Sequence, residues 1–107
     1  MLYFEWDTWK AAKNFRDHKV SFGAARAALE DPHAIEEEDQ VIEGEVRLRT
    51  TGMAEGEVIV LVTHTNRDGE NEGDEIARII SARKASLGER RQYDELRTSS
   101  SRNTSDQ

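Results

Sequence analysis

The side chains best suited to chemistry in this chain are cations, and they are crowded into one stretch of an acidic sequence. Between Arg78 and Tyr93 there are five cationic residues and one carboxylate, Glu89, although the chain of 107 residues carries a formal charge of -7. The five are Arg78, Arg83, Lys84, Arg90 and Arg91. Positive charge kept together inside an acidic protein favours an anionic ligand. This segment is therefore the first candidate for a functional site.

Arginine suits a phosphate ligand because its planar fork offers two donors at once and stays charged. Arg67 adds a cation at the end of an apolar strand, and Arg78 lies inside the next strand. By strand alternation Arg78 shares a face with isoleucines, where a charge is costly unless it is paired. Two interpretations follow. Arg78 either bridges a carboxylate, such as Glu89 or one near Asp7, or is presented in a groove of the sheet.

A histidine is the candidate for proton transfer. His64 lies at the carboxyl end of a predicted strand, close to Arg67. Imidazole titrates near neutral pH and can serve as a general acid or base. The alternative is a strand-end histidine that bonds only to solvent or backbone. The other two histidines, His18 and His33, fall in predicted loops, and without carboxylates at ligand spacing the three predict no metal site.

A strand and a helix are predicted to open the chain and to begin its core. Residues 2–6 alternate between buried and exposed types, which is typical of a strand with one buried face. Asp7 is a suitable cap for a helix over residues 8–16. The apolar stripe on one side of that helix consists of Trp9, Ala12 and Phe15. We expect both Trp6 and Trp9 to lie in the core.

A second helix is predicted from Ser21, with Phe22 and alanines on its apolar side, and Pro32 disfavours helical geometry just beyond its end. We expect the two helices to form an antiparallel hairpin. The next segment, residues 30–45, holds eight carboxylates and is interpreted as a solvated loop with a short edge strand. The alternative is a docking surface for a basic partner, or a shield against non-cognate nucleic acid.

Three antiparallel strands are predicted next, joined as a meander. Glu45–Arg49 alternates, with its valine and leucine pointing inward. Val58–Val62 is continuously apolar and is predicted to be the central strand, covered on both faces. A polar loop over residues 66–73 leads to the returning strand, Glu75–Ser81. A strand, two helices, a meander and a final helix together predict an α+β fold.

The final helix is predicted from about Leu87 to Arg97. Ser86 and Glu89 have the spacing of a capping box at its start. Tyr93 is interpreted as the helix's anchor in the core, with stacking on a nucleic-acid base as the alternative. We expect residues 1–97 to form a single domain and residues 98–107 a polar, disordered tail.

Composition limits the class of protein. The chain has no cysteine, which excludes disulfides and thiolate metal sites and fits a reducing cytoplasm. No apolar run approaches the length of a membrane helix, and the first residues do not resemble a signal peptide. We therefore expect a cytoplasmic protein that works without a membrane, a metal or another cofactor.

Four segments, taken in order, resemble the BrnT-type toxins. They are FEWDTWKAAKNFRDHKVSF, GEVRLRTTG, VIVLVTHTNRDG and RIISARKASLGERRQY, and the resemblance covers roughly residues 3–95. The resemblance implies a RelE-like fold and a ribosome-independent endoribonuclease that arrests translation. It also implies a partner, a BrnA-type antitoxin with a ribbon-helix-helix domain. That antitoxin would give indirect contact with operator DNA, and the expected complex has two toxins with an antitoxin dimer.

Metal-independent RNA cleavage requires a base near the ribose 2′-hydroxyl, cations on the phosphate and a proton source for the leaving oxygen. The residues expected to act in catalysis are His64, Arg67, Arg78, Arg83 and Lys84. Those expected to bind RNA are Arg47, Arg90, Arg91 and Tyr93. A plain RNA-binding module is disfavoured because no aromatic pair is predicted to be exposed on a strand.

Two positions depart from the family pattern. The family usually reads H-G-V-S-F where this chain has Lys19, so a side chain replaces a glycine and is costly if the position needs a positive φ. The loop after Arg67 is also longer and more acidic, which is expected to weaken activity or RNA affinity. The alternative function is therefore a catalytically weak or inactive protein that binds the antitoxin and modulates its DNA binding.

Overall fold

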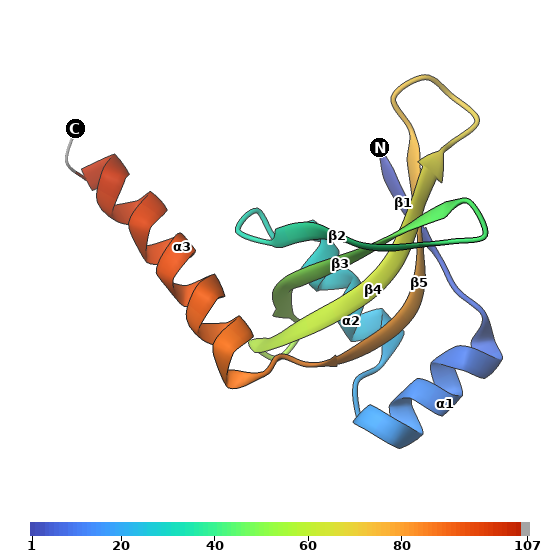
Figure 1. Ribbon diagram of the computed structural model, residues 1–107, viewed down its shortest axis with the longest axis horizontal. Helices are drawn as coiled ribbons and strands as arrows, with labels where there is room; N and C mark the ends of the chain where they lie inside the picture. The colour runs from blue at the N-terminus through green and yellow to red at the C-terminus, as the bar shows by residue number, and fades with distance from the viewer. Residues whose placement is uncertain (106–107) are drawn as a thin grey trace.

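The computed structural model describes residues 1–105, with side chains described as far as Thr98. Five strands form one mixed sheet in the order β1-β5-β4-β3-β2 (Figure 1). The strands are β1 (Leu2–Glu5), β2 (Ile35–Ile42), β3 (Glu45–Ala54), β4 (Val58–Asp68) and β5 (Glu75–Lys84). The helices are α1 (Thr8–His18), α2 (Phe22–Glu30) and α3 (Leu87–Ser105). The predicted α+β order is confirmed.

The parallel pairing of β1 with β5 is the feature that matters most for the site. Leu2 pairs with Glu75 and Glu5 with Arg78, while β2, β3, β4 and β5 pair antiparallel as the predicted meander. β4 is the middle strand, as predicted, and three consecutive residues of it, Val60, Leu61 and Val62, are buried. Because strand side chains alternate, both faces of β4 are covered.

Helix α1 begins where predicted. The Asp7 side chain accepts hydrogen bonds from the backbone N–H groups of Trp9 and Lys10. The helix ends at Lys19, whose φ of 60° and ψ of 26° are left-handed. A left-handed conformation costs a residue with a side chain about 1 kcal/mol relative to glycine. The departure at Lys19 therefore carries the strain that the sequence predicted.

The prediction that Trp9, Ala12 and Phe15 form the buried face of α1 is wrong. Trp9 is 76% exposed and Phe15 51% exposed, while Asn14 is buried. The Asn14 amide donates to the carbonyls of Val20 and Ala82 and accepts from the Ala82 N–H. β1 pairs with β5 only as far as Arg78, so Ala82 has β4 on one side but no strand on the other, and Asn14 takes the place of the missing strand. This bonding turns Trp9 outward, although Trp6 does pack against the core as predicted.

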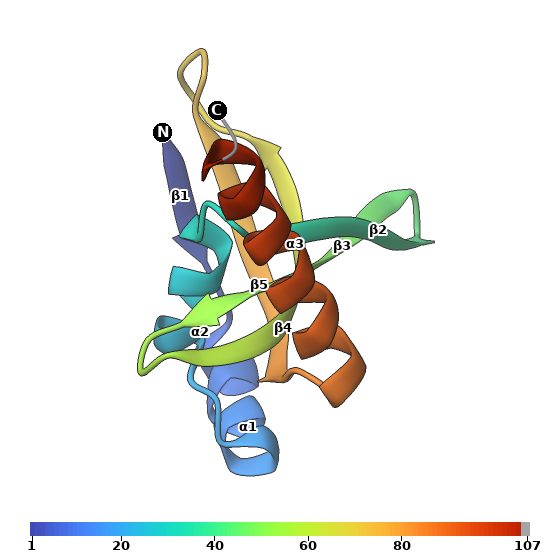
Figure 2. The same ribbon diagram turned by 90° about the vertical axis from the view of Figure 1, so that its left-hand side faces the viewer.

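Helix α2 packs directly on the sheet. Ser21 caps it as predicted, and Phe22, Ala25 and Ala28 are buried in the core. A Cβ built on Gly52 of β3 would lie 2.5 Å from the Ala28 carbonyl oxygen, so helix and strand approach as closely as backbones allow. The two predicted helices are confirmed, with α1 below α2 in Figure 2, and each packs mainly on the sheet rather than on the other helix.

The strands run further than the sequence predicted. β3 continues beyond Arg49 to Ala54, β4 continues beyond Val62 to Asp68, and β5 continues beyond Ser81 to Lys84. Val46, expected to point inward, is 41% exposed. The acidic segment contributes β2, an eight-residue edge strand whose carboxylates are exposed. Charged side chains on an edge strand oppose its pairing with other chains.

Helix α3 leaves the sheet after its first turns (Figure 1). Its capping box is confirmed: the Ser86 N–H donates to the Glu89 carboxylate, and the Glu89 N–H donates to the Ser86 hydroxyl. The helix continues beyond the predicted end at Arg97, so the division of the chain near residue 97 stays a prediction. Among the described residues, no helix is long and apolar enough to cross a membrane.

Candidate functional site

One carboxylate holds two of the predicted catalytic arginines. Arg67 donates to both oxygens of Glu5, with Nη1 and Nη2 each 2.7 Å from an oxygen, and Arg78 Nη1 lies 3.2 Å from Glu5 Oε2. We call these three residues the Glu5 cluster. The sheet register explains it: Glu5 is opposite Arg78, and Arg67 is opposite Ile76, one diagonal step away on the same face.

The Glu5 cluster is open to solvent, and its carboxylate and guanidinium groups stabilise one another's charged forms. The Arg67 and Arg78 side chains are 54% and 45% exposed, and that of Glu5 is 33% exposed. The hydrogen bond from Arg67, supported by Arg78, lowers the pKa of Glu5 to about 2. Glu5 in turn raises the pKa of Arg67. At neutral pH the cluster therefore presents one carboxylate and two guanidinium groups to any ligand of this face.

His64 lies on the opposite face of the sheet from the Glu5 cluster. It is three residues before Arg67 on β4, and the alternation of side chains places the two on different faces. His64 is only 2% exposed. Its Nδ1 lies 2.8 Å from the Asn66 amide oxygen and its Nε2 lies 2.8 Å from the Thr50 hydroxyl. The predicted proximity of His64 to the arginines is wrong.

The surroundings of His64 keep it neutral. Because the Asn66 oxygen can only accept, Nδ1 carries the proton and Nε2 accepts from Thr50. Burial lowers the pKa of His64 below its usual value. Both ring nitrogens are engaged, so the structure supports a packing role for this histidine.

A second ion pair, between Arg83 and Glu89, joins the end of β5 to the start of α3. Arg83 Nη1 and Nη2 lie 2.8 and 3.0 Å from the two Glu89 oxygens, and Nη1 also donates to the Lys84 carbonyl. The hydrogen bond from Arg83 lowers the pKa of Glu89 to about 2. Lys84 and Arg90 line a hollow of about 350 Å³ beside this pair. Arg83, Lys84 and Arg90 thus form a group of their own, whereas Arg78 of the same segment belongs to the Glu5 cluster.

The residues expected to bind RNA are divided between surface and core. Arg47 lies on the same face as Arg67 by alternation, and its Nε is buried without a hydrogen-bond partner among the described residues. Arg90 and Arg91 are exposed on α3. Tyr93 is buried, and its hydroxyl donates to Asp31, which also accepts from the Met53 N–H. These contacts support the interpretation of Tyr93 as the residue that anchors α3 in the core.

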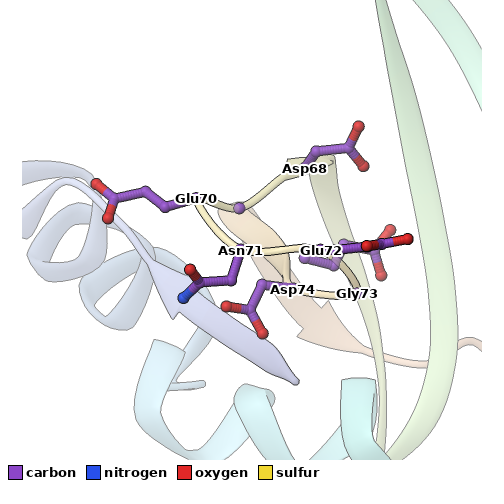
Figure 3. Close-up of a pocket in the computed structure, with 8 residues that line it drawn as sticks. Asp68, Glu70, Asn71, Glu72, Gly73 and Asp74 are labelled. Atoms are coloured by element: carbon purple, nitrogen blue, oxygen red, sulfur yellow. The ribbon is translucent and has the colours of Figure 1, made fainter.

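The acidic loop between β4 and β5 projects from one end of the sheet. It encloses a hollow of about 610 Å³ lined by residues 68–75. Figure 3 shows the side chains of Asp68 and Glu70 pointing away from one another at its rim. Among the described residues, no group of three histidine or carboxylate side chains is placed to hold a metal ion. The loop therefore adds negative charge beyond Arg67 without forming a metal site.

Two features of the surface were missed at the level of sequence. Glu5 was assigned only to strand alternation, because its role depends on parallel pairing with a strand some 70 residues away. Trp9 was assigned to the core, because an apolar stripe on a helix is usually buried. Asn14 was the available signal that Trp9 points outward. It is the amide residue of α1, and an amide can bond to the unpaired backbone groups at the edge of a strand.

The fold and the sequence match known proteins. The family model described as the ribonuclease toxin BrnT of type II toxin–antitoxin systems matches residues 6–89. The crystal structure of the Brucella abortus ribonuclease toxin BrnT superposes with a TM-score of 0.58 at 25% sequence identity. The alignment covers 81% of this chain and 99% of that one. Comparison with curated proteins gave no match.

Proposed function

Because the chain belongs to the BrnT family of ribonuclease toxins of type II toxin–antitoxin systems, we propose that it is a metal-independent endoribonuclease with its active site at the Glu5 cluster. A toxin of this type has an antitoxin protein as its partner. We propose that this partner carries a ribbon-helix-helix domain, that two toxins join one antitoxin dimer, and that RNA cleavage arrests translation in the cytoplasm.

The observation that carries the proposal is one carboxylate held between two exposed arginines. This set contains a base and two phosphate ligands on a face that a strand of RNA can reach. The 2′-hydroxyl oxygen would attack the adjacent phosphorus and lose its proton to Glu5, while the bond to the 5′ oxygen breaks. The 5′ oxygen would take a proton from solvent, and the other product would end in a 2′,3′-cyclic phosphate. Arg67 and Arg78 would bind the phosphate oxygens as their charge builds.

The low pKa of Glu5 is compatible with a basic role once RNA is bound. A carboxylate with a pKa of about 2 is a weak base while Arg67 and Arg78 are bonded to it. A phosphate group competes for the same guanidinium donors, and as it takes them over, the pKa of Glu5 rises toward that of a free carboxyl. Substrate binding would then strengthen the base beside the hydroxyl. Arg47, on the same face, is proposed to bind a neighbouring phosphate.

The test separates catalysis from binding in two variants. Glu5→Gln should lower kcat for cleavage of a single-stranded oligoribonucleotide by about 10²-fold or more, while its KM falls because both arginines are released to the phosphate. Arg78→Lys should raise KM and lower kcat, since lysine keeps the charge but not the fork. The matched control is Glu37→Gln, which removes an exposed carboxylate paired with Arg49 at 3.4 Å. Excess EDTA should leave the rate unchanged, and wild-type activity in Glu5→Gln would refute the assignment.

A second function, antitoxin binding without catalysis, is favoured by one observation. Arg67, Arg78 and Arg83 are all bonded to carboxylates within the chain. If RNA phosphates cannot displace Glu5, only the partner-binding role is left. Induced expression in a bacterial host, with and without the antitoxin, distinguishes the two. Growth arrest with RNA cleavage, lost in Arg78→Ala while antitoxin binding persists, supports the nuclease; normal growth with intact RNA supports the binding role.

A further inference from the structure

The outward side of α1 carries an exposed tryptophan among cations. Trp9, Lys13 and Arg16 are spaced four and three residues apart, so they share one side of the helix, opposite the buried Asn14. We call these three residues the α1 outer face. Trp9 is 76% exposed, and the Lys13 and Arg16 side chains are 59% and 69% exposed. An exposed indole flanked by cations is a surface on which a flat ring with attached negative charge can bind.

The charge on this side of the molecule is positive, against the net charge of the chain. Lys10 and Lys19 join Lys13 and Arg16 on or just beyond α1. The carboxylate of Asp17 is already bonded to Lys13 at 2.9 Å and lies 3.5 Å from Arg16, and the hydrogen bond from Lys13 lowers its pKa. Asp17 and the helix cap Asp7 offset two of these four cations, which leaves a surplus of positive charge on this side. In a chain of formal charge -7, such a surface suits an anionic ligand.

A groove leads from the α1 outer face to the strand that carries Arg78. The groove, of about 170 Å³, lies between α1 and β5. Its helix side is lined by Lys10, Lys13, Asn14, Asp17 and His18, of which Asp17 is bonded to Lys13, and its strand side by Ile80 and Ser81, two and three residues beyond Arg78. Trp9 directly precedes Lys10 on α1, and Arg78 lies two residues before Ile80 on β5, so an RNA strand in the groove would lie between these two residues.

We propose that the α1 outer face binds single-stranded RNA beyond the scissile phosphate, with an unpaired base stacked on Trp9 and the neighbouring phosphates on Lys10 and Lys13. This inference rests on the proposed function, whose substrate class it narrows to single-stranded RNA. Stacking on an aromatic ring flanked by cations is how proteins hold single strands without reading sequence. A protein partner fits this face less well, because lysine is depleted at the centres of protein interfaces.

Trp9 is also the reporter for the test. In a Trp6→Phe background it is the only tryptophan, so its fluorescence reports base stacking directly. The probe is a fluorescein-labelled 2′-O-methyl oligoribonucleotide, which has no free 2′-hydroxyl and resists cleavage. We expect the single strand to quench Trp9 and a duplex of the same sequence to leave its fluorescence unchanged. By anisotropy, Trp9→Ala should weaken binding of the single strand about tenfold, the loss of one stacked base.

Charge is tested by salt dependence and by a control on the same helix. Lys10→Gln should lower the slope of log K against log salt by about 0.7, the value for one phosphate contact on a single strand. Phe15→Ala is the matched control, since Phe15 is an aromatic residue 51% exposed on α1, six positions from Trp9 and therefore on another side of the helix, and it should bind the probe like wild type. Thermal unfolding of each variant checks that the fold is retained.

The outcomes separate this inference from the proposed function. Quenching by the probe without cleavage of unmodified RNA supports the α1 outer face and overturns the nuclease. Cleavage by wild type together with unchanged probe affinity in Trp9→Ala overturns the inference and leaves the nuclease intact. Equal affinity for duplex and single strand overturns it as well. Loss of antitoxin binding in Trp9→Ala with unchanged RNA affinity also overturns it, and assigns the face to the protein partner.

Discussion

The ion pair between Arg83 and Glu89 gives a pH-dependent prediction with a calculable size. Glu89→Gln keeps the shape of the side chain and removes its charge, so it mimics the protonated carboxyl at every pH. Glu89 accepts from both Arg83 nitrogens and from the Ser86 N–H, and its side chain is 24% exposed. The variant therefore tests how strongly this pair joins α3 to the sheet.

The size of the effect follows from the pKa of Glu89. Arg83 lowers that pKa from 4.5 to about 2, and a change of one in pKa corresponds to about 1.4 kcal/mol. The full difference corresponds to about 3 kcal/mol, which is an upper limit because Arg83 is 43% exposed and water screens the pair. We expect Glu89→Gln to lower the free energy of unfolding by about 2 kcal/mol at pH 7.

The sign of the pH dependence is fixed by the direction of the shift. The folded carboxyl binds its proton more weakly than the unfolded one, so the stabilisation is complete above pH 4.5 and is lost as the pH falls toward 2. Urea unfolding of wild type and variant at pH 7 and pH 3 should give a difference that shrinks by about half. Glu37→Gln, in an exposed pair, should change stability by less than about 0.5 kcal/mol. An equal difference for Glu89→Gln at both pH values would refute the pairing.

Three further substitutions test the fold by urea unfolding. Lys19→Gly should stabilise the protein by about 1 kcal/mol, because φ is 60° there; a loss of stability would contradict the left-handed cap. Tyr93→Phe should cost about 2 kcal/mol, because it removes one hydrogen bond to the Asp31 carboxylate; no change would mean that Tyr93 anchors α3 by packing alone. Gly52→Ala should cost about 2 kcal/mol or more, because its Cβ would lie 2.5 Å from the Ala28 carbonyl oxygen; wild-type stability would contradict that close approach.

Local signals in the sequence predicted local structure well. The caps at Asp7 and Ser21 and the capping box at Ser86 are all present, since each depends on residues no more than three positions apart. The central strand is also predictable, because a continuous β-branched run fits only a position covered on both faces. These features fix the order of the elements and hence the fold class.

The Glu5 cluster was not predictable in the same way. It requires β1 to lie parallel to β5 in one register, and alternation along β1 gives no information about which strand lies beside it. The prediction that His64 lies beside Arg67 was wrong for a related reason. Its closeness to Arg67 in sequence suggested a shared site, but an odd separation along a strand places two side chains on opposite faces.

The exposure of Trp9 shows how a single polar residue can reverse the orientation of a helix. An Asn14 that pointed to solvent would leave the Ala82 N–H and carbonyl without partners at the edge of β5, and each buried unsatisfied group costs about 1–3 kcal/mol. Burying Trp9 in its place would recover about 4 kcal/mol of hydrophobic stabilisation, from roughly 150–200 Å² of indole surface at about 25 cal/mol per Å². The two backbone groups and the amide together outweigh one indole, so α1 turns its polar residue inward. The hydrogen bonds that complete the sheet edge thus also create the surface on which we propose that RNA stacks.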